Sequence, residues 1–154
     1  MSASPFLLCA PDQGERLRFL DDSSLVLKST GDGSAESIAH YEYIAQPAAR
    51  GSAQHIHRRH DETFCVVEGT FEFALGRDLY VAPPGTFLLV RRGQPHGFRN
   101  CGGTPGRIIG TFGAYFAQYF RELARIIERT GAPPNLRDWT ALYARYETTF
   151  YDAG

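Results

Sequence analysis

Residues 54–69 read QHIHRRHDETFCVVEG, and this stretch carries a pattern of imidazole and carboxylate side chains. His55 and His57 are two residues apart, so on a β-strand they project from the same face, roughly 7 Å apart along the backbone. A turn after His57 would bring Glu62 from the next strand to the same point. Imidazole suits zinc, iron, nickel and copper, and a carboxylate broadens the choice toward manganese. The stretch therefore predicts a metal site between strands.

The bulk composition excludes several classes of protein. A chain of 154 residues fits one domain, residues 1–154, with a proper hydrophobic core. The formal net charge of −1 provides no strong field for nucleic acid or anionic lipid, and no apolar run is long enough to cross a membrane. The three cysteines contain no C-x-x-C and do not describe a disulfide framework. The N-terminus lacks the features of a signal peptide, so we expect a cytoplasmic protein.

Short β-type runs separated by glycine and proline extend from about residue 6 to residue 112. One such run, Thr63 to Val67, leads through Glu68-Gly69 into Thr70 to Leu75, and we expect these two runs to form a hairpin. Others stop at Pro83-Pro84-Gly85 and near Gly93-Gln94-Pro95. Many short strands with this punctuation favour a sandwich or a barrel.

The pattern becomes helical from about residue 114 to residue 150. Apolar residues recur at helical spacing from Phe116 to Ile127, and Gly131 with Pro133 marks the end of that helix. A second helix is expected over about residues 137–150, with Trp139, Leu142, Tyr143, Tyr146 and Phe150 on its apolar face. We interpret the two helices as a cap packed on the barrel; the alternative is a lid over a substrate pocket.

Two stretches resemble the motifs of the cupin superfamily. The string HIHRRHDETFCVVEG, residues 55–69, is similar to the first cupin motif, and GTFLLVRRGQPHGFRN, residues 85–100, is similar to the second, through Gly85, Gly93, His96 and Asn100. The chain resembles the small single-domain, quercetin-dioxygenase-like members of the Cupin_2 type. This resemblance implies a mainly β fold, the double-stranded β-helix or jelly-roll barrel, here with two C-terminal α-helices.

The resemblance also implies a ligand set, namely His55, His57, Glu62 and His96 on one divalent ion. Iron is the first choice, with zinc, manganese, nickel, cobalt and copper as alternatives. Four protein ligands leave one or two coordination positions for water, O₂ or substrate. His60, in the turn between the ligands, is expected to be a solvated residue and not a fifth ligand.

Aromatic residues of the strands are the candidates for a substrate pocket. They are Tyr41, Tyr43, Phe64, Phe73, Phe98 and Phe112. For any one of them plain barrel core is the simpler interpretation, but together they favour an apolar or aromatic small-molecule ligand.

Three functions remain open. Resemblance to quercetin dioxygenases predicts a metal-dependent oxygenase acting on a small aromatic or polyphenolic molecule with O₂, in which Glu62 is the catalytic general base. The second is a metal-assisted cyclase or isomerase of natural-product biosynthesis, in which the ion acts as a Lewis acid on a polyketide-like chain. The third is a non-catalytic small-molecule-binding cupin. A homodimer is expected in each case, because small open barrels present edge strands that need covering.

Overall fold

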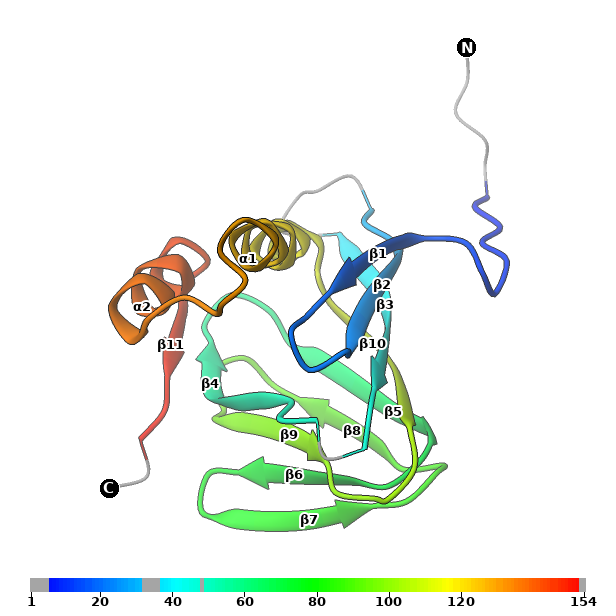
Figure 1. Ribbon diagram of the computed structural model, residues 1–154. Helices are drawn as coiled ribbons and strands as arrows, with labels where there is room; N and C mark the ends of the chain where they lie inside the picture. Colours follow the sequence, from blue (N-terminus) through cyan, green and yellow to red (C-terminus); the bar gives the residue numbers. More distant parts are fainter. Residues whose placement is uncertain (1–5, 32–36, 48, 153–154) are drawn as a thin grey trace.

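The computed structural model describes residues 6–31, 37–47 and 49–152. Their strands form two antiparallel sheets that pack as a sandwich (Figure 1). The first sheet has the order β1-β2-β3-β10-β5-β8, with β1 at Glu15–Arg18, β2 at Ser24–Ser29, β3 at Ile38–Ala45, β10 at Gly106–Gly113, β5 at Glu62–Glu68 and β8 at Phe87–Val90. The second has the order β11-β4-β9-β6-β7, with β11 at Thr148–Phe150, β4 at Ser52–His57, β9 at His96–Asn100, β6 at Phe71–Leu75 and β7 at Asp78–Ala82.

The strands follow the alternation that a half-buried sheet requires. In β3, Ala39, Tyr41, Tyr43 and Ala45 are buried, while the residues between them are exposed or half-buried. Phenylalanines of both sheets fill the space between them, and several are almost fully buried. The expectation of a mainly β jelly roll with two C-terminal helices is confirmed.

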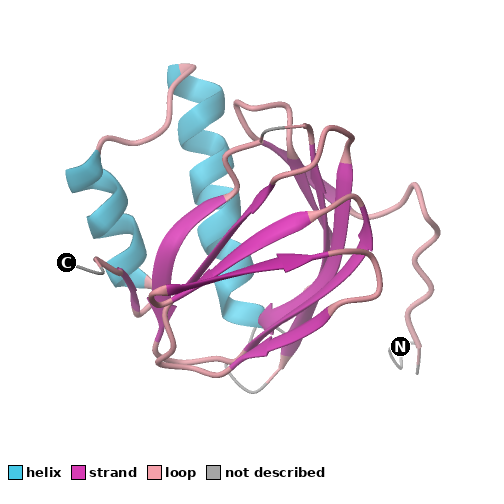
Figure 2. Cartoon of the chain, turned by 90° about the horizontal axis from the view of Figure 1, so that it is seen from below, coloured by secondary structure: helices cyan, strands magenta, loops and turns pink. Residues whose placement is uncertain are grey.

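The two helices lie together on one side of the strands (Figures 1 and 2). After a short 3₁₀ turn, η1 at Ala114–Phe116, helix α1 covers Ala117–Thr130 and helix α2 covers Leu136–Arg145. Helix α1 ends because Gly131 adopts a left-handed conformation and its N–H donates to the Ile127 carbonyl. Within the described residues, neither helix is long and apolar enough to span a bilayer.

The expected hairpin between Thr63–Val67 and Thr70–Leu75 is wrong. Strand β5 pairs with β10 and β8, whereas β6 pairs with β7 and β9 in the other sheet. The chain therefore changes sheets at Glu68-Gly69 instead of turning back within one. Gly69 has a positive φ of 74°, and a Cβ there would lie 2.7 Å from the Gly106 Cα, so this crossing needs glycine.

The second helix is shorter than expected. It ends at Arg145 rather than near residue 150, and Thr148–Phe150 forms strand β11 along the edge of β4. Phe150 continues the apolar spacing of the helix, which explains the error. Two adjacent β-branched threonines favour a strand, and the open edge of β4 supplies the backbone partner.

Candidate metal centre

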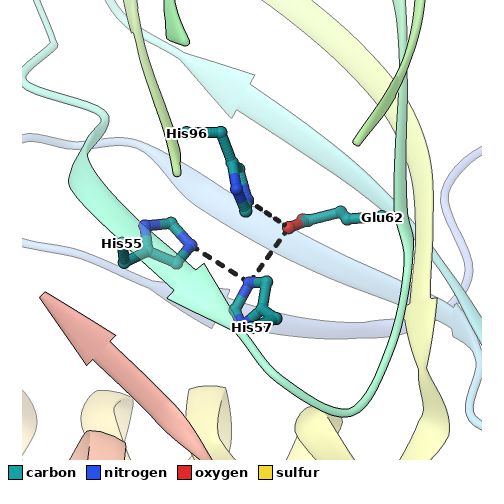
Figure 3. Close-up of side chains that lie close together, drawn as sticks. All are labelled: His55, His57, Glu62 and His96. Atoms are coloured by element: carbon teal, nitrogen blue, oxygen red, sulfur yellow. Dashed lines mark hydrogen bonds and ion pairs between the residues drawn. The ribbon is translucent and has the colours of Figure 1, made fainter. Parts of the chain in front are cut away.

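Four side chains converge inside the sandwich (Figure 3). His55 and His57 come from β4, Glu62 from the first position of β5, and His96 from the first position of β9. One nitrogen or oxygen atom of each lies within 4.8 Å of the others, and all four residues are buried. The structure thus brings together every residue that the sequence predicts as a metal ligand.

Strand pairing and two loop contacts hold these residues in register. His55 lies directly opposite His96 in the antiparallel pair of β4 and β9. The Asp61 carboxylate accepts from the backbone N–H of Arg92 at 2.9 Å, and the Gly93 N–H donates to the His57 carbonyl at 2.7 Å. The turn that carries Glu62 and the turn that precedes His96 are therefore tied to one another.

The outer ring nitrogens of the histidines are already hydrogen-bonded. Nδ1 of His55 donates to the Ala53 carbonyl at 2.8 Å, and Nδ1 of His96 donates to the Gln94 carbonyl at 3.1 Å. Because a carbonyl only accepts, these rings carry their hydrogen on Nδ1 and can direct an Nε2 lone pair into the cluster. Nδ1 of His57 lies 2.9 Å from Thr148 Oγ1.

The inner atoms form an electron-rich group. Nε2 of His57 lies 3.1 Å from Nε2 of His55 and 3.1 Å from Oε2 of Glu62, and Nε2 of His96 lies 3.0 Å from the same oxygen. A single proton could satisfy only one of these contacts, whereas a divalent cation could satisfy all of them. Three imidazoles and one carboxylate are a donor set that suits several transition metals, so this cluster could bind one metal ion.

Burial and mutual contact shift the pKa values of the cluster in different directions. Burial raises the pKa of Glu62, but its contacts with His57 and His96 outweigh burial and hold that pKa well below 4.5. Burial also lowers the pKa of His96, yet the hydrogen bond and charge of Glu62 outweigh it and raise the pKa above 6.5. Burial, reinforced by the neighbouring histidines, lowers the pKa of His55 well below 6.5, and burial lowers that of His57.

Tyr41 adds a further polar contact to the cluster. Its buried hydroxyl donates to Oε1 of Glu62 at 3.3 Å, the oxygen that does not face the histidines. Desolvation and the charge of Glu62 raise the pKa of Tyr41 well above 10, so the hydroxyl keeps its proton. The contact orients the carboxylate from the side of β3.

A cavity of about 690 Å³ reaches the cluster, and His55, His57 and Glu62 belong to its lining. Most of the other lining side chains are aromatic or aliphatic. From the strands these include Tyr41, Tyr43 and Phe98, and from the helical segment Phe116, Tyr119, Leu123, Trp139 and Tyr143. The Tyr143 ring stacks on His55 at a centroid distance of 5.6 Å. The helices therefore both cap the barrel and form one wall of the cavity.

Three of the six predicted pocket residues do not line this cavity. Phe64 and Phe73 pack against each other at 5.2 Å in the barrel core, and Phe112 packs against Tyr41 at 5.0 Å. All three are at most 2% exposed, which fits the simpler core interpretation. The predicted pocket residues did not include the helical side chains of the cavity wall, such as Tyr143. The spacing of Trp139 and Tyr143 indicates an apolar helix face, but it does not show that this face packs on strand β4, which carries His55 and His57.

The expectation that His60 is solvated is wrong. It is 5% exposed, its ring stacks on His57 at 4.3 Å, and its Nδ1 lies 2.8 Å from the Tyr115 hydroxyl. Burial first, and then the charge of His57, lowers the pKa of His60 to about 3, so the ring is neutral. It packs behind one ligand and is not among the four converging residues.

These features define a double-stranded β-helix with a buried three-histidine, one-glutamate site beneath an apolar cavity. Residues 41–112 match the family model of the cupin domain, Cupin_2. This match covers slightly less than half of the chain and shows the likeness of that stretch to a cupin domain. No curated protein matches the chain by sequence.

Solved structures similar to the chain share its fold at low sequence identity. An RmlC-like cupin from Shewanella frigidimarina is 22% identical, with a TM-score of 0.58 over 71% of this chain and 90% of that one. A sugar phosphate isomerase from a cupin superfamily, from Silicibacter pomeroyi, is 21% identical, with a TM-score of 0.60 over 69% and 74%. FeII HppE is 16% identical, with a TM-score of 0.60 over 71% and 62%. At these identities the likeness establishes the cupin fold alone.

Proposed function

We propose that the protein is a metal-dependent enzyme that acts on a small aromatic molecule, as a quercetin-dioxygenase-like oxygenase that uses O₂. The observation that carries this proposal is the apolar cavity, whose lining includes aromatic side chains and three of the four converging residues, His55, His57 and Glu62. Its volume of about 690 Å³ lies in the range typical of small-molecule sites. Among its lining residues only Asp21, Arg50 and Glu62 are charged, which favours an aromatic substrate over a sugar phosphate.

His55, His57, Glu62 and His96 would hold one divalent ion, with iron proposed first and zinc, manganese, nickel, cobalt and copper as alternatives. Such an ion, when bound, supplies Lewis acidity and a binding position for substrate oxygen and O₂. The structural neighbour HppE is described with iron(II), which is consistent with iron as the first choice. That iron is a property of HppE.

The chain's own residues would perform the proton chemistry and the positioning. Glu62 is ionised at neutral pH, because its pKa is held well below 4.5, and is therefore available to accept the proton of a substrate hydroxyl. The Tyr41 hydroxyl would keep the carboxylate oriented through Oε1. Tyr143 from helix α2 and Phe98 from strand β9 both line the cavity, and they would hold an aromatic ring and exclude water.

The test is oxygen consumption by iron-loaded protein with a panel of flavonols and catechols, followed by product analysis. Substrate-dependent O₂ uptake is expected. Turnover of a substrate without O₂ would overturn the oxygenase and assign the protein to the cyclase or isomerase alternative. Tight ligand binding without turnover would assign it to the non-catalytic alternative.

A matched pair of variants tests the cavity itself. Leu123→Trp places an indole in the cavity from α1 and is expected to weaken binding of the aromatic ligand. Leu136→Trp makes the same change at a side chain that is 73% exposed and should leave binding unchanged. Equal affinities of the two folded variants would contradict this cavity as the substrate site.

The homodimer and the cytoplasmic location stay predictions. Strand β7 lies at one edge of its sheet and exposes the apolar side chains of Leu79, Tyr80 and Val81. A second copy of the chain could cover this edge in a homodimer.

A further inference from the structure

The ligand His57 differs from the other two histidines in what its outer nitrogen contacts. Nδ1 of His55 and of His96 each bonds a carbonyl two residues earlier in the chain, so local backbone supplies the acceptor. Nδ1 of His57 instead lies 2.9 Å from Oγ1 of Thr148, which is 91 residues away in sequence. The orientation of this one ligand therefore depends on a distant segment of the chain.

The backbone places Thr148 for this contact. Strand β11 runs antiparallel to β4, and Thr148 lies directly opposite His57 in the register, so both side chains project from the same face of the sheet. The pairing is visible in Figure 3, where β11 is the reddish arrow beside the ligand strand. Thr148 is 1% exposed, so water does not compete for its hydroxyl.

The hydroxyl of Thr148 has one hydrogen, which Oγ1 donates to the Tyr146 carbonyl at 3.1 Å. Towards His57 the same oxygen can therefore only accept, which requires the ring hydrogen on Nδ1 and leaves the lone pair on Nε2. Nε2 is the atom that lies 3.1 Å from Glu62 and from Nε2 of His55, where a ligand atom is needed.

We propose that Thr148 is a positioning residue that fixes His57 in its metal-binding tautomer, so that docking of the C-terminal strand completes the metal centre. The proposal rests on the metal centre of the proposed function, but not on any particular reaction. It also links the substrate cavity to the metal, because Tyr143 of the cavity wall and Thr148 belong to the same C-terminal segment. Partners of this kind orient imidazole ligands and raise their basicity.

Two substitutions separate the hydrogen bond from the shape of the residue. Thr148→Val keeps the volume and the β-branch but removes the acceptor, and Thr148→Ser keeps the hydroxyl. Thr149→Val makes the same chemical change one residue on, where the side chain points to the other face of the strand, and serves as the matched control.

The measurement is zinc affinity by competition with a chromophoric chelator, because zinc binding reports on the site without turnover. Thr148→Val is expected to lose roughly 10- to 100-fold in affinity. Thr148→Ser and Thr149→Val should both stay within a few-fold of the unmodified protein. Equal affinity of Thr148→Val and the unmodified protein would overturn this proposal alone. Absence of zinc binding by the unmodified protein would overturn the metal centre as well.

A second measurement covers the case in which Thr148→Val does not fold. In the zinc-loaded unmodified protein, the Nδ1 proton of His57 should give an NMR resonance that resists exchange with solvent, because it is buried and hydrogen-bonded to Thr148. A His57 ring proton that exchanges as fast as that of an exposed imidazole would overturn the proposal.

Discussion

Protons compete with a metal ion for the three histidines of the cluster, and a change of pH from 6.5 to 5.5 should reveal how strongly they compete. Burial keeps the pKa of His55 well below 6.5 and lowers that of His57, so these rings take up a proton at a lower pH than an ordinary imidazole does. His96, whose pKa Glu62 raises above 6.5, is protonated through most of this range.

The direction and the size of the change in metal affinity with pH follow from this difference between the histidines. A proton on Nε2 of His96 must leave before the atom can bind a metal, so affinity falls as the pH falls. One competing proton weakens binding by about tenfold per pH unit. Three independent histidines with ordinary pKa values would together weaken it by more than about a hundredfold over the same unit.

The assay is zinc binding in competition with an indicator whose own protonation is known, at constant ionic strength. A dissociation constant that rises about tenfold between pH 6.5 and 5.5 is the expected result. A rise of more than about a hundredfold would refute the assigned shifts of His55 and His57. No change at all would place His96 outside the site.

Three substitutions extend the tests. Glu62→Gln should reduce turnover more than metal content, measured on the same preparation, because the residue is proposed as both ligand and base; equal losses would leave it a ligand only. Leu142→Ala should lower the free energy of unfolding in urea by about 2–5 kcal/mol, because the side chain is 1% exposed, whereas Leu136→Ala, at 73% exposure, should change it by less than about 0.5 kcal/mol. Gly110→Ala should lower the melting temperature, because its Cβ would lie 2.2 Å from the Thr63 carbonyl oxygen; an unchanged melting temperature would contradict the packing of β10 against β5.

The metal ligands could be predicted because their signal is local or carried by a motif. His55 and His57 share a strand face by their spacing alone, and the resemblance to the second cupin motif added His96. The strand alternation and the helical spacing likewise indicated the β-sandwich and the two C-terminal helices.

The errors arose where a distant partner decides the structure. Gly69 has the character of a turn residue, but local chemistry does not show whether the chain stays in one sheet, and here it crosses to the other. Residues 148–150 continue a helical spacing, yet the open edge of β4 makes them a strand. Thr148 could not be identified for the same reason, since its importance comes from lying opposite His57.

The four-ligand metal centre can be checked by the metal content of the purified protein after anaerobic loading with iron(II), measured beside His96→Ala. One ion per chain is expected in the unmodified protein and a clear loss in the variant, because His96 is one of the four converging residues. A protein that retains no metal, or an unchanged stoichiometry in His96→Ala, would contradict this metal centre.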